Sequence, residues 1–397
     1  MMEAPRQSFN KNFSDSAYKN YLASFEKAFP HALDFRVAET PIFIDKAFLH
    51  KMLDTGDYVN SVIQSHPFKA ITEKALKYCA IFPNETALPD CIIMDFAITL
   101  NKDNKWEPAL IELQGFPSLF AFEILHHKCL QKNYTLPMPF SPYINGYNEK
   151  KYKSHLDTIL NKPNKHTVLL EILPHQQKTR IDFYCTEKYF NIPIICLSEI
   201  FVEGNKLFYL KNGKKIKIDR IFNRIVLDEL KNQSQDIQEK GALLQTPLEI
   251  EWVTHPHHFF RISKFLLPFL KHKYIPTTLF ANSIELKTFE LEKFILKPLF
   301  SFAGQGVIID IQTSDIDKLK NLDEWIIQEK VEYANCIDTP TGPAKAEIRL
   351  FYFWDEKSQK YIATMNLARL SKGKMIGVNY NKDKQWVGGS LAYFEMS

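Results

Sequence analysis

Two apolar segments on either side of a short polar turn constrain the fold most. Residues 91–100 and 109–114 are rich in isoleucine, leucine and alanine, and the polar residues 101–106 separate them. Short apolar runs that flank such a turn are typical of an antiparallel β-hairpin. Each run nevertheless carries one carboxylate, Asp95 in the first and Glu112 in the second. The chain therefore contains a predicted hairpin with acidic side chains inside apolar strands.

The register of this hairpin follows from its turn. Asp103 and Asn104 both tolerate positive φ, and a hairpin symmetric about them places Asp95 opposite Glu112. Gln114 shares a face with Glu112, because side chains alternate along a strand. Directly opposed like charges are destabilising, and a Mg²⁺ ion would offset the repulsion because it prefers oxygen ligands. The alternative is a solvated hairpin face with two exposed acids, but the flanking apolar runs favour burial.

Residues 294–310 form a second informative stretch, Phe-Ile-Leu-Lys-Pro-Leu-Phe-Ser-Phe-Ala-Gly-Gln-Gly-Val-Ile-Ile-Asp. An apolar strand ends at Lys297, a loop with Gly304 and Gly306 follows, and extended structure resumes. Glycines allow backbone N–H groups to approach a phosphate, and the lysine adds a positive charge. The stretch is not a P-loop, because it lacks the Gly-Lys-Ser/Thr ending and leads into a strand. An ordinary glycine-containing hairpin is the alternative.

The hairpin and the glycine loop together carry a family resemblance. Asp95, followed by Glu112-Leu-Gln114-Gly-Phe-Pro-Ser118, resembles the metal motif of glutathionylspermidine synthase and related circularly permuted ATP-grasp proteins. In that family, as here, the acidic motif precedes the lysine loop. The resemblance implies ATP and Mg²⁺ as cofactors, with Asp95, Glu112 and Gln114 as the metal ligands. Gln114 stands where the family has asparagine, and its carbonyl oxygen lies one methylene further out.

The same resemblance implies roles on the nucleotide side. Lys264 and Lys297 would hold the phosphates, and Arg349 would stabilise the γ-phosphate during transfer. The loop and hinge residues that would border the nucleotide are Ser301, Gly304, Gln305, Gly306, Gln328, Glu329 and Val331. Two alternatives stay open: Lys264 as a lysine whose stem lies along an amphipathic helix, and Arg349 as the partner of Glu347 on one strand face.

The predicted fold is α+β or α/β, a circularly permuted ATP-grasp with additions at the N-terminus and in the middle. Apolar spacings of three and four predict helices in the N-terminal part, and alternating β and α patterns predict a small sheet in the middle. An Asn212-Gly213 turn predicts a hairpin there. The expected divisions are a helical region at 1–85, the metal-motif part at 86–160, a substrate-side αβ domain resembling a pre-ATP-grasp domain at 161–240, and the nucleotide-binding part at 241–397.

Composition narrows the class of partners. The 50 basic and 46 acidic residues leave a net charge of +4, which gives no strong case for nucleic acid. No apolar run approaches the ~18 residues of a membrane span, and the polar N-terminus has no signal-peptide pattern. None of the six cysteines has Cys-x-x-Cys spacing. We therefore expect reduced cysteines and a cytoplasmic protein without membrane or nucleic-acid partners, whose oligomeric state the sequence leaves open.

Two polar clusters outside the resemblance remain ambiguous. Arg220 and Arg224 follow each other on one predicted strand, where they are either a bidentate grip for a substrate carboxylate or surface ion pairs. His255, His257 and His258 crowd a proline turn without the spacing of metal ligands.

The function that the sequence favours is an ATP- and Mg²⁺-dependent carboxylate–amine ligase acting through an acylphosphate. Its substrates would be a small-molecule or peptide carboxylate and an amine acceptor, and Lys297 and Arg349 would act on the phosphates. The departure at Gln114 motivates an alternative, a non-catalytic regulatory or scaffold protein that binds ATP. A small-molecule kinase on the same fold is a third possibility.

Overall fold

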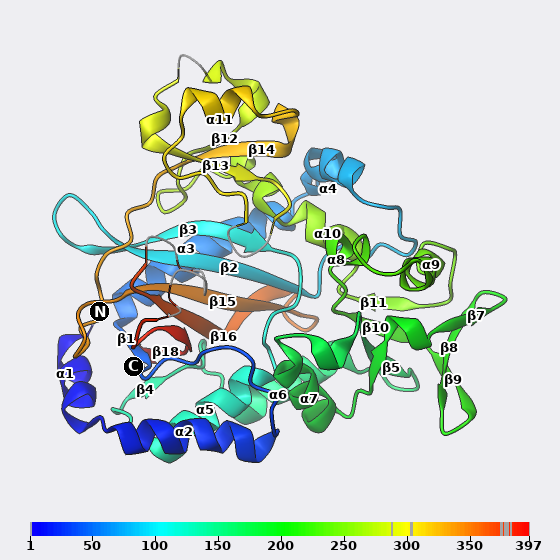
Figure 1. Ribbon diagram of the computed structural model, residues 1–397, viewed down its shortest axis with the longest axis horizontal. Helices are drawn as coiled ribbons and strands as arrows, with labels where there is room; N and C mark the ends of the chain where they lie inside the picture. Colours follow the sequence, from blue (N-terminus) through cyan, green and yellow to red (C-terminus); the bar gives the residue numbers. More distant parts are fainter. Residues whose placement is uncertain are drawn as a thin grey trace.

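A five-stranded antiparallel sheet forms the centre of the computed structural model, which describes residues 2–286, 289–301, 305–373, 376, 381 and 383–396. Its strand order is β17-β16-β15-β2-β3 (Figure 1). The bounds are β2 Cys91–Leu100, β3 Trp106–Gln114, β15 Lys345–Asp355, β16 Lys360–Ser371 and β17 Gly388–Ser390. Strands from the first third and the last seventh of the chain therefore meet in one sheet.

The predicted hairpin is present with the expected pairing of Asp95 and Glu112. Asn104 has a φ of 56°, as the turn requires. The register is not uniform, however, because Phe96 pairs with Leu110 and an irregularity lies between Asp95 and Phe96. The extra residue, Ile111, restores the expected pairs beyond it. Without the bulge, the register at the turn would pair Asp95 with Ile111. The extra residue shifts this pairing to Glu112.

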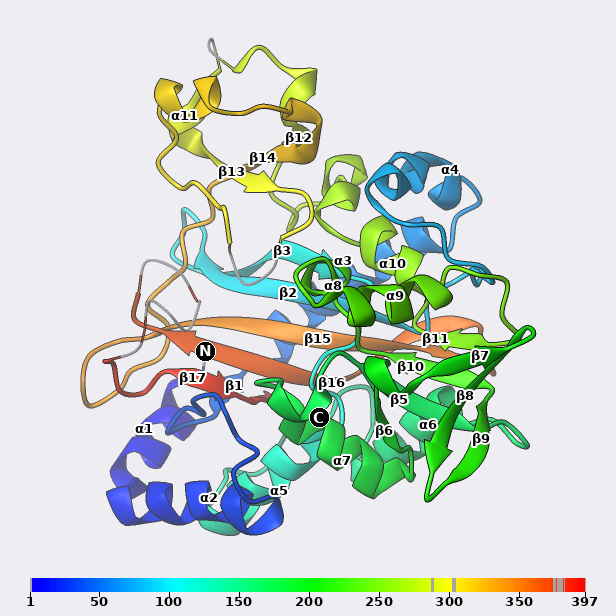
Figure 2. The same cartoon turned by 45° about the vertical axis from the view of Figure 1, so that its right-hand side comes forward.

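A small subdomain stands above the sheet at the top of Figures 1 and 2, and we call residues 278–329 the lid. Its antiparallel sheet has the order β12-β14-β13. The bounds are β12 Thr278–Phe280, β13 Phe294–Pro298 and β14 Trp325–Glu329, with α11 Thr313–Asp317, η5 Ala281–Ser283, η7 Leu291–Lys293 and η8 Leu322–Glu324. An isolated bridge joins Leu296 to Ile308 across the glycine loop, so extended structure resumes at Ile308 as predicted, but the described residues form no strand there. Gly304 lies outside the described residues.

A parallel sheet of order β11-β10-β5-β6 lies beside the central sheet, on the right of Figure 1. Its elements are β5 Thr167–Glu171, η2 Pro174–Gln176, α7 Arg180–Phe190, β6 Ile194–Cys196, η3 Leu197–Glu199, β10 Arg220–Asn223, α8 Leu227–Leu230, α9 Gln235–Leu243 and β11 Glu251–Val253. The chain leaves β5 toward β6 and later returns to the other side of β5, so the strand order reverses between β5 and β10. Since β11 belongs to this sheet, the sheet extends past the division expected at residue 240.

An antiparallel sheet projects from this unit, with β7 Phe201–Glu203, β8 Lys206–Lys211 and β9 Lys214–Ile218. The predicted hairpin turn is confirmed, because Asn212 and Gly213 have φ values of 51° and 75°. Lys215 pairs with Glu203 at exposed positions, and Lys217 pairs with Asp219 at half-buried positions.

The N-terminal region is helical as predicted, but it also contributes a strand. β1 Ile42–Ile44 pairs in parallel with β18 Ala392–Glu395, and β4 Phe140–Ser141 completes that sheet. The remaining helices are α1 Glu3–Asn12, α2 Asp15–Ala28, α3 Lys46–Ile63, α4 Phe68–Thr72, η1 Glu73–Tyr78, α5 Phe122–Asn133, α6 Glu149–Leu160, α10 Pro256–Arg261 and η4 Lys264–Phe269. The sequence also predicts a strand at residues 377–381, but of these residues the structure describes Asn381 alone.

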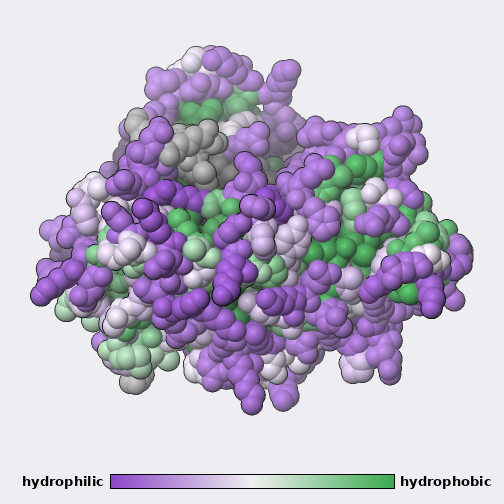
Figure 3. Space-filling view, turned by 60° about the horizontal axis from the view of Figure 1, so that its bottom comes forward, coloured by the Kyte–Doolittle hydropathy of each residue, from purple (hydrophilic) through white to green (hydrophobic). Residues whose placement is uncertain are grey.

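None of the helices described has both the length and the apolar character needed to cross a membrane. Hydrophilic residues cover most of the face shown in Figure 3, and the hydrophobic ones there form separate patches.

Candidate functional site

The predicted nucleotide residues meet between the lid and the central sheet. Lys297, on β13 of the lid, points its Nζ toward β3 and donates to the backbone oxygen of Ile111 at 3.3 Å. The same Nζ donates to Oε1 of Gln328 at 2.6 Å, and Gln328 is fully buried on β14. Lys297 is therefore held by β14 within the lid and by β3 of the central sheet.

Lys264 reaches the same place from η4. Its Nζ donates to the backbone oxygen of Ser301 at 2.8 Å and lies 3.7 Å from Oε1 of Glu112. Lys264 is only 7% exposed, so it is not a surface lysine lying along an amphipathic helix. Lys264 and Lys297, the two lysines predicted to hold phosphates, thus both lie near Glu112.

The electrostatics of the two lysines reflect this burial. The pKa of Lys297 is lowered to about 8, chiefly by burial. Nearby Lys264 contributes to this lowering, and Glu112 opposes it. Burial likewise lowers the pKa of Lys264, again against the effect of Glu112. Two buried ammonium groups that share one carboxylate form an electropositive site that is suited to an anion.

A small pocket adjoins these lysines. It is lined by Glu112, Leu113, Gln114, Phe259, Ile262, Ser263, Lys264, Leu299, Phe300 and Ser301. Its volume is about 20 Å³, roughly that of one water position. The Ser301 hydroxyl is buried and has no hydrogen-bond partner among the described residues. The pocket therefore contains an unsatisfied polar group beside Lys264. Its volume is too small for a triphosphate, which would fit only if the lid moved outward.

Asp95 is held by arginines rather than facing this pocket. Nε and Nη2 of Arg349 donate to Oδ1 and Oδ2 of Asp95, each at 2.6 Å. Nη2 of Arg369 also donates to Oδ2, at 3.0 Å. Although burial alone would raise the pKa of Asp95, the two guanidinium groups hold it below its usual range. Asp95 is a buried carboxylate with both oxygens engaged.

Glu347 completes this network on β15. It accepts hydrogen bonds from Arg369 and from the Tyr333 hydroxyl, the latter at 2.9 Å. The expected alternative of an Arg349–Glu347 pair is replaced, because Arg349 pairs across strands with Asp95. Arg369 belongs to this network, although it is not among the site residues predicted from the sequence. Three carboxylates (Asp95, Glu112, Glu347) and four cations (Lys264, Lys297, Arg349, Arg369) therefore lie in one cluster.

The predicted magnesium ligands fit only in part. In this structure both oxygens of Asp95 accept hydrogen bonds from Arg349 or Arg369, so its role as a magnesium ligand stays a prediction. Glu112 keeps 29% of its side chain exposed, and Gln114 lines the same pocket. Among the residues that the structure describes, no three histidine, cysteine or acidic side chains are grouped as metal ligands. Glu112 and Gln114 are the members of the set that fit an oxygen-coordinated ion sharing phosphate ligands.

The other predicted loop and hinge residues are distributed around the cleft. Gln305 and Gly306 are exposed, and Gly306 has a φ of 74°. Glu329 is exposed at the end of β14, where its Oε2 accepts from the Thr277 amide at 3.3 Å. Val331 is half-buried just after this strand. These positions line the lid edge, whereas Gln328 faces Lys297.

Ser118 connects this cluster to the parallel sheet. Its hydroxyl accepts from Nη1 of Arg349 at 3.2 Å, and its backbone oxygen accepts from Nη1 of Arg224 at 2.7 Å. Arg224 also pairs with buried Asp182 at 3.0 Å, so it is not a surface residue. Arg220 has a structural role, since it donates to the backbone of Leu160 and to Glu251. Ser118 stood within the quoted motif, but nothing in the sequence identified its two partners.

Arg224 follows β10 at the point where the order of the parallel strands reverses. Ligands of open α/β sheets bind outside the carboxyl ends of the strands at such a point. Asn223 and Glu171, at the ends of β10 and β5, are both buried there. Burial raises the pKa of Glu171 to about 8. Ser118 therefore links the reversal point, through Arg224, to Arg349 of the charged cluster.

Comparison with known proteins supports the fold. The chain is similar to the solved structure of a glutathione synthetase-like effector from Globodera pallida in its apo form, with a TM-score of 0.55 and 11% sequence identity. The match covers 97% of this chain and 98% of the other. No family model and no curated protein matches the sequence. The architecture is thus a mixed α/β fold like that of a glutathione synthetase-like protein.

Proposed function

We propose that this chain is an ATP-grasp ligase of circularly permuted order, which uses ATP to join a carboxylate to an amine. The observation that carries the proposal is the convergence of Lys264 and Lys297 on Glu112 under the start of the glycine loop. The similarity to a glutathione synthetase-like structure supports the fold. The permuted order is supported by the position of β2 and β3 before the lid and of β15 and β16 after it.

The nucleotide would lie between the lid and the central sheet. Lys264, Lys297 and the Ser301 hydroxyl would hold its phosphates, and the lid edge at Glu329 and Val331 would border the base. A lysine whose pKa is near 8 is mostly protonated at neutral pH, so it would meet the phosphates as a cation. Glu112 and Gln114 would hold Mg²⁺ together with phosphate oxygens, and the ion would neutralise charge on those oxygens.

Arg349 is positioned for a part in phosphoryl transfer. Asp95 binds its Nε and Nη2, which leaves Nη1 with the Ser118 hydroxyl as its partner. A guanidinium held in this way is oriented before substrate arrives, and preorganised charge is the main device of phosphoryl-transfer enzymes. Asp95 is then a positioning residue for Arg349.

The acid substrate would bind toward the reversal point of the parallel sheet. Its carboxylate oxygen would attack the γ-phosphorus, breaking the bond to the ADP oxygen and forming an acylphosphate. The amine would then attack the acyl carbon, lose a proton and release phosphate. Arg224 and Ser118 lie on the path between the two sheets, and Asn223 borders it. These residues mark the side from which both substrates would approach.

Thermal unfolding with Mg²⁺-ATP tests the nucleotide site. Nucleotide at about 100 times its dissociation constant should stabilise the wild type by about 2.7 kcal/mol. Lys297→Ala should lose most of this shift, whereas Lys293→Ala, on the exposed side of the lid, should keep it. An unchanged shift in Lys297→Ala would contradict the assignment. ADP and phosphate release that requires both an acid and an amine then tests ligation.

One observation favours a second function, nucleotide binding without transfer. Asp95 and Arg349 already satisfy each other, so the cluster is nearly balanced in charge as it stands. A regulatory or scaffold protein would bind ATP but release no ADP with any acceptor. Trapping of an acyl hydroxamate by hydroxylamine would exclude this function, and a stable phosphorylated product without an amide would identify a kinase.

A further inference from the structure

Phe300, the residue that precedes Ser301 at the start of the glycine loop, is held between two aromatic rings from outside the lid. Its ring lies 5.1 Å from that of Tyr78 and 5.0 Å from that of Phe260, centroid to centroid. Tyr78 is the last residue of η1, and Phe260 belongs to α10. Aromatic rings at these separations attract each other beyond simple burial. The start of the loop is thus seated on the body of the protein.

The neighbouring end of β14 is held by the same turn of η1. Nζ of Lys77 lies 2.6 Å from Oδ2 of Asp323, and the Tyr78 hydroxyl donates to the backbone oxygen of Asp323 at 3.1 Å. Within the lid, the Leu299 amide donates to the backbone oxygen of Glu324 at 2.8 Å. Tyr78 therefore contacts two lid segments, the start of the glycine loop at Phe300 and η8 at Asp323, and Lys77 contacts η8.

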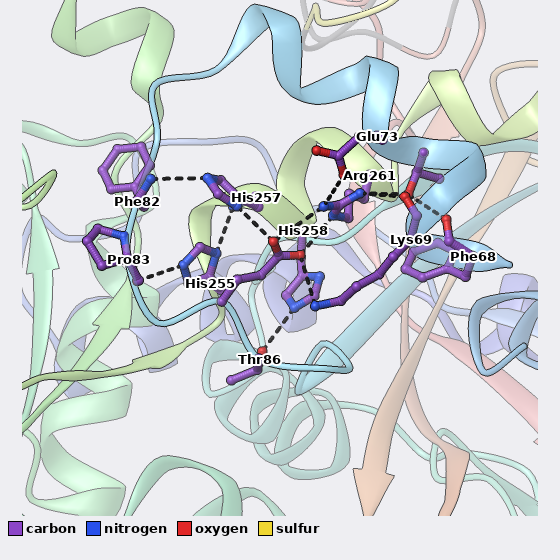
Figure 4. A network of polar contacts seen from close by, with 12 residues as sticks. Phe68, Lys69, Glu73, Phe82, Pro83, Thr86, His255, His257, His258 and Arg261 are labelled. Carbon is purple, nitrogen blue, oxygen red and sulfur yellow. Dashed lines mark hydrogen bonds and ion pairs between the residues drawn. The ribbon is translucent and has the colours of Figure 1, made fainter. Parts of the chain in front are cut away.

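The η1 turn is itself anchored by a buried polar network (Figure 4). Arg261, 3% exposed, donates to Glu73 at 2.9 Å and to Glu85 at 2.8 Å. It also donates to the backbone oxygen of Lys69 and to the Thr72 hydroxyl. Figure 4 shows Arg261 lying beside Glu73 and Lys69, with the histidines of α10 next to it. The histidine cluster left unexplained by the sequence thus belongs to this anchor.

The histidines tie the chain after η1 to the same helix. His257 accepts from the Phe82 amide at 3.1 Å and contacts Glu85 at 3.0 Å, and His258 contacts Thr86 at 3.0 Å. Burial lowers the pKa of His258 to about 3, so it packs as a neutral ring. Both sides of η1 are therefore fixed to α10, three residues before Lys264.

We propose that η1 is a clasp for the lid, in which Tyr78 and Lys77 are positioning residues that hold the lid against the body of the protein through Phe300 and Asp323. The 20 Å³ pocket is the closed state, and nucleotide enters when Phe300 leaves the slot between Tyr78 and Phe260. Arg261 keeps the clasp close to Lys264, because only Ile262 and Ser263 separate the end of α10 from the start of η4. The part of this proposal that concerns nucleotide entry rests on the proposed function, whereas the clasp itself does not.

The clasp is tested without nucleotide by measuring the distance between lid and body. Spin labels on an unnatural ketone residue, at the exposed positions of Lys320 and Lys102, leave all six cysteines unlabelled. Pulsed dipolar spectroscopy should give mainly one distance in the wild type. Tyr78→Ala should increase the ratio of open to closed lid by about 3- to 10-fold, the range expected for loss of one aromatic pair.

Three variants make the result specific. Tyr78→Phe keeps the ring and removes the bond to Asp323, so it should have a smaller effect than Tyr78→Ala. Lys77→Glu should open the lid, and Lys77→Glu combined with Asp323→Lys should close it again. Lys74→Ala, exposed on the same turn, should leave the distribution unchanged. Phe300→Leu provides the same test from the lid side if Tyr78→Ala does not fold.

Wild-type distances in folded Tyr78→Ala and Phe300→Leu would overturn the clasp. If the lid opens in these variants, stopped-flow mixing with Mg²⁺-ATP should show about 3- to 10-fold faster association than in the wild type. Lid opening in the variants without any nucleotide binding to the wild type would leave the clasp intact and reject the proposed function. Nucleotide binding to a wild type whose lid is insensitive to Tyr78 would do the reverse.

Discussion

Arg349 and Asp95 face each other across β15 and β2, and two hydrogen bonds of 2.6 Å join the guanidinium to both carboxylate oxygens. The pair is buried, with 1% of the Asp95 side chain and 12% of the Arg349 side chain exposed. Removing one partner of such a pair leaves a buried charge without compensation. Both the fold and the proposed phosphoryl transfer therefore depend on this pair.

Asp95→Ala should destabilise the fold by about 3–5 kcal/mol, the usual cost of breaking a buried ion pair. The pKa of Asp95 is held below its usual range, so its stabilising effect is present above the pKa of the unfolded chain and is lost as pH falls through the folded pKa. Urea unfolding between pH 3 and pH 7 measures both effects. The wild type should lose its advantage over Asp95→Asn in the acid range, and a constant difference would contradict the pairing.

Lys297 predicts a second rise of stability with pH, of the same sign but in the alkaline range. Its folded pKa is about 8 against an ordinary value of 10.5, so between these values the unfolded chain binds more protons than the folded one. Stability conferred by this residue should then rise with pH across the window from about 8 to 10.5. Wild type should gain on Lys297→Met when unfolding is compared at pH 7.5 and pH 10.

Glu112 should control the dependence of nucleotide binding on magnesium. Glu112→Gln removes the charge that faces both lysines and the one carboxylate that remains exposed at the pocket. Calorimetric titration with ATP should show tighter binding with Mg²⁺ than without it in the wild type, and no such difference in Glu112→Gln. Gln114→Asn, which keeps an amide oxygen, should retain the difference. If Glu112→Gln also retained it, the ion would have to be held elsewhere.

Gly115 predicts a steric effect next to the site. A Cβ at this position would lie 2.3 Å from the backbone oxygen of His258, which is too close for any van der Waals contact. The Gly115 amide also donates to the backbone oxygen of Ile262 at 2.7 Å. Gly115→Ala should therefore push β3 away from α10 and lower the melting temperature by several degrees. Gly146→Ala offers a comparison, since a Cβ there meets nothing within 4 Å although its φ is positive.

Local chemistry explains which parts of the fold could be predicted from the sequence. The hairpin at Asn212-Gly213 depends on a turn a few residues away, and so does the existence of the hairpin that carries Asp95 and Glu112. The pairing of Asp95 with Glu112 also requires the bulge at Ile111, which the turn does not predict. After the glycine loop, the described residues form an isolated bridge at Ile308 instead of a strand. Where residues close in sequence decide the geometry, the turns and their hairpins were predicted correctly.

The partners of the charged site residues could not be obtained in this way. The sequence predicted that Arg349 either meets phosphate or pairs with Glu347, two residues away, but its partner Asp95 lies 254 residues away on a strand that no local turn brings near. The link from Ser118 to Arg224 likewise spans 106 residues. Such contacts depend on strand order, which the alternation of side chains along one strand does not determine.

The strand order of the central sheet also determines when the sheet can be completed during synthesis. β2 and β3 leave the ribosome long before β15, against which β2 must pair, because 230 residues separate the end of β3 from the start of β15. Until then the hairpin exposes an unpaired edge and a carboxylate without its arginine, and contacts between such distant segments form slowly. A nascent chain stalled before residue 345 would therefore expose the unpaired edge of β2 and the carboxylate of Asp95 to chaperones. The central sheet is completed only after β15 and β16, near the end of the chain, have been synthesised.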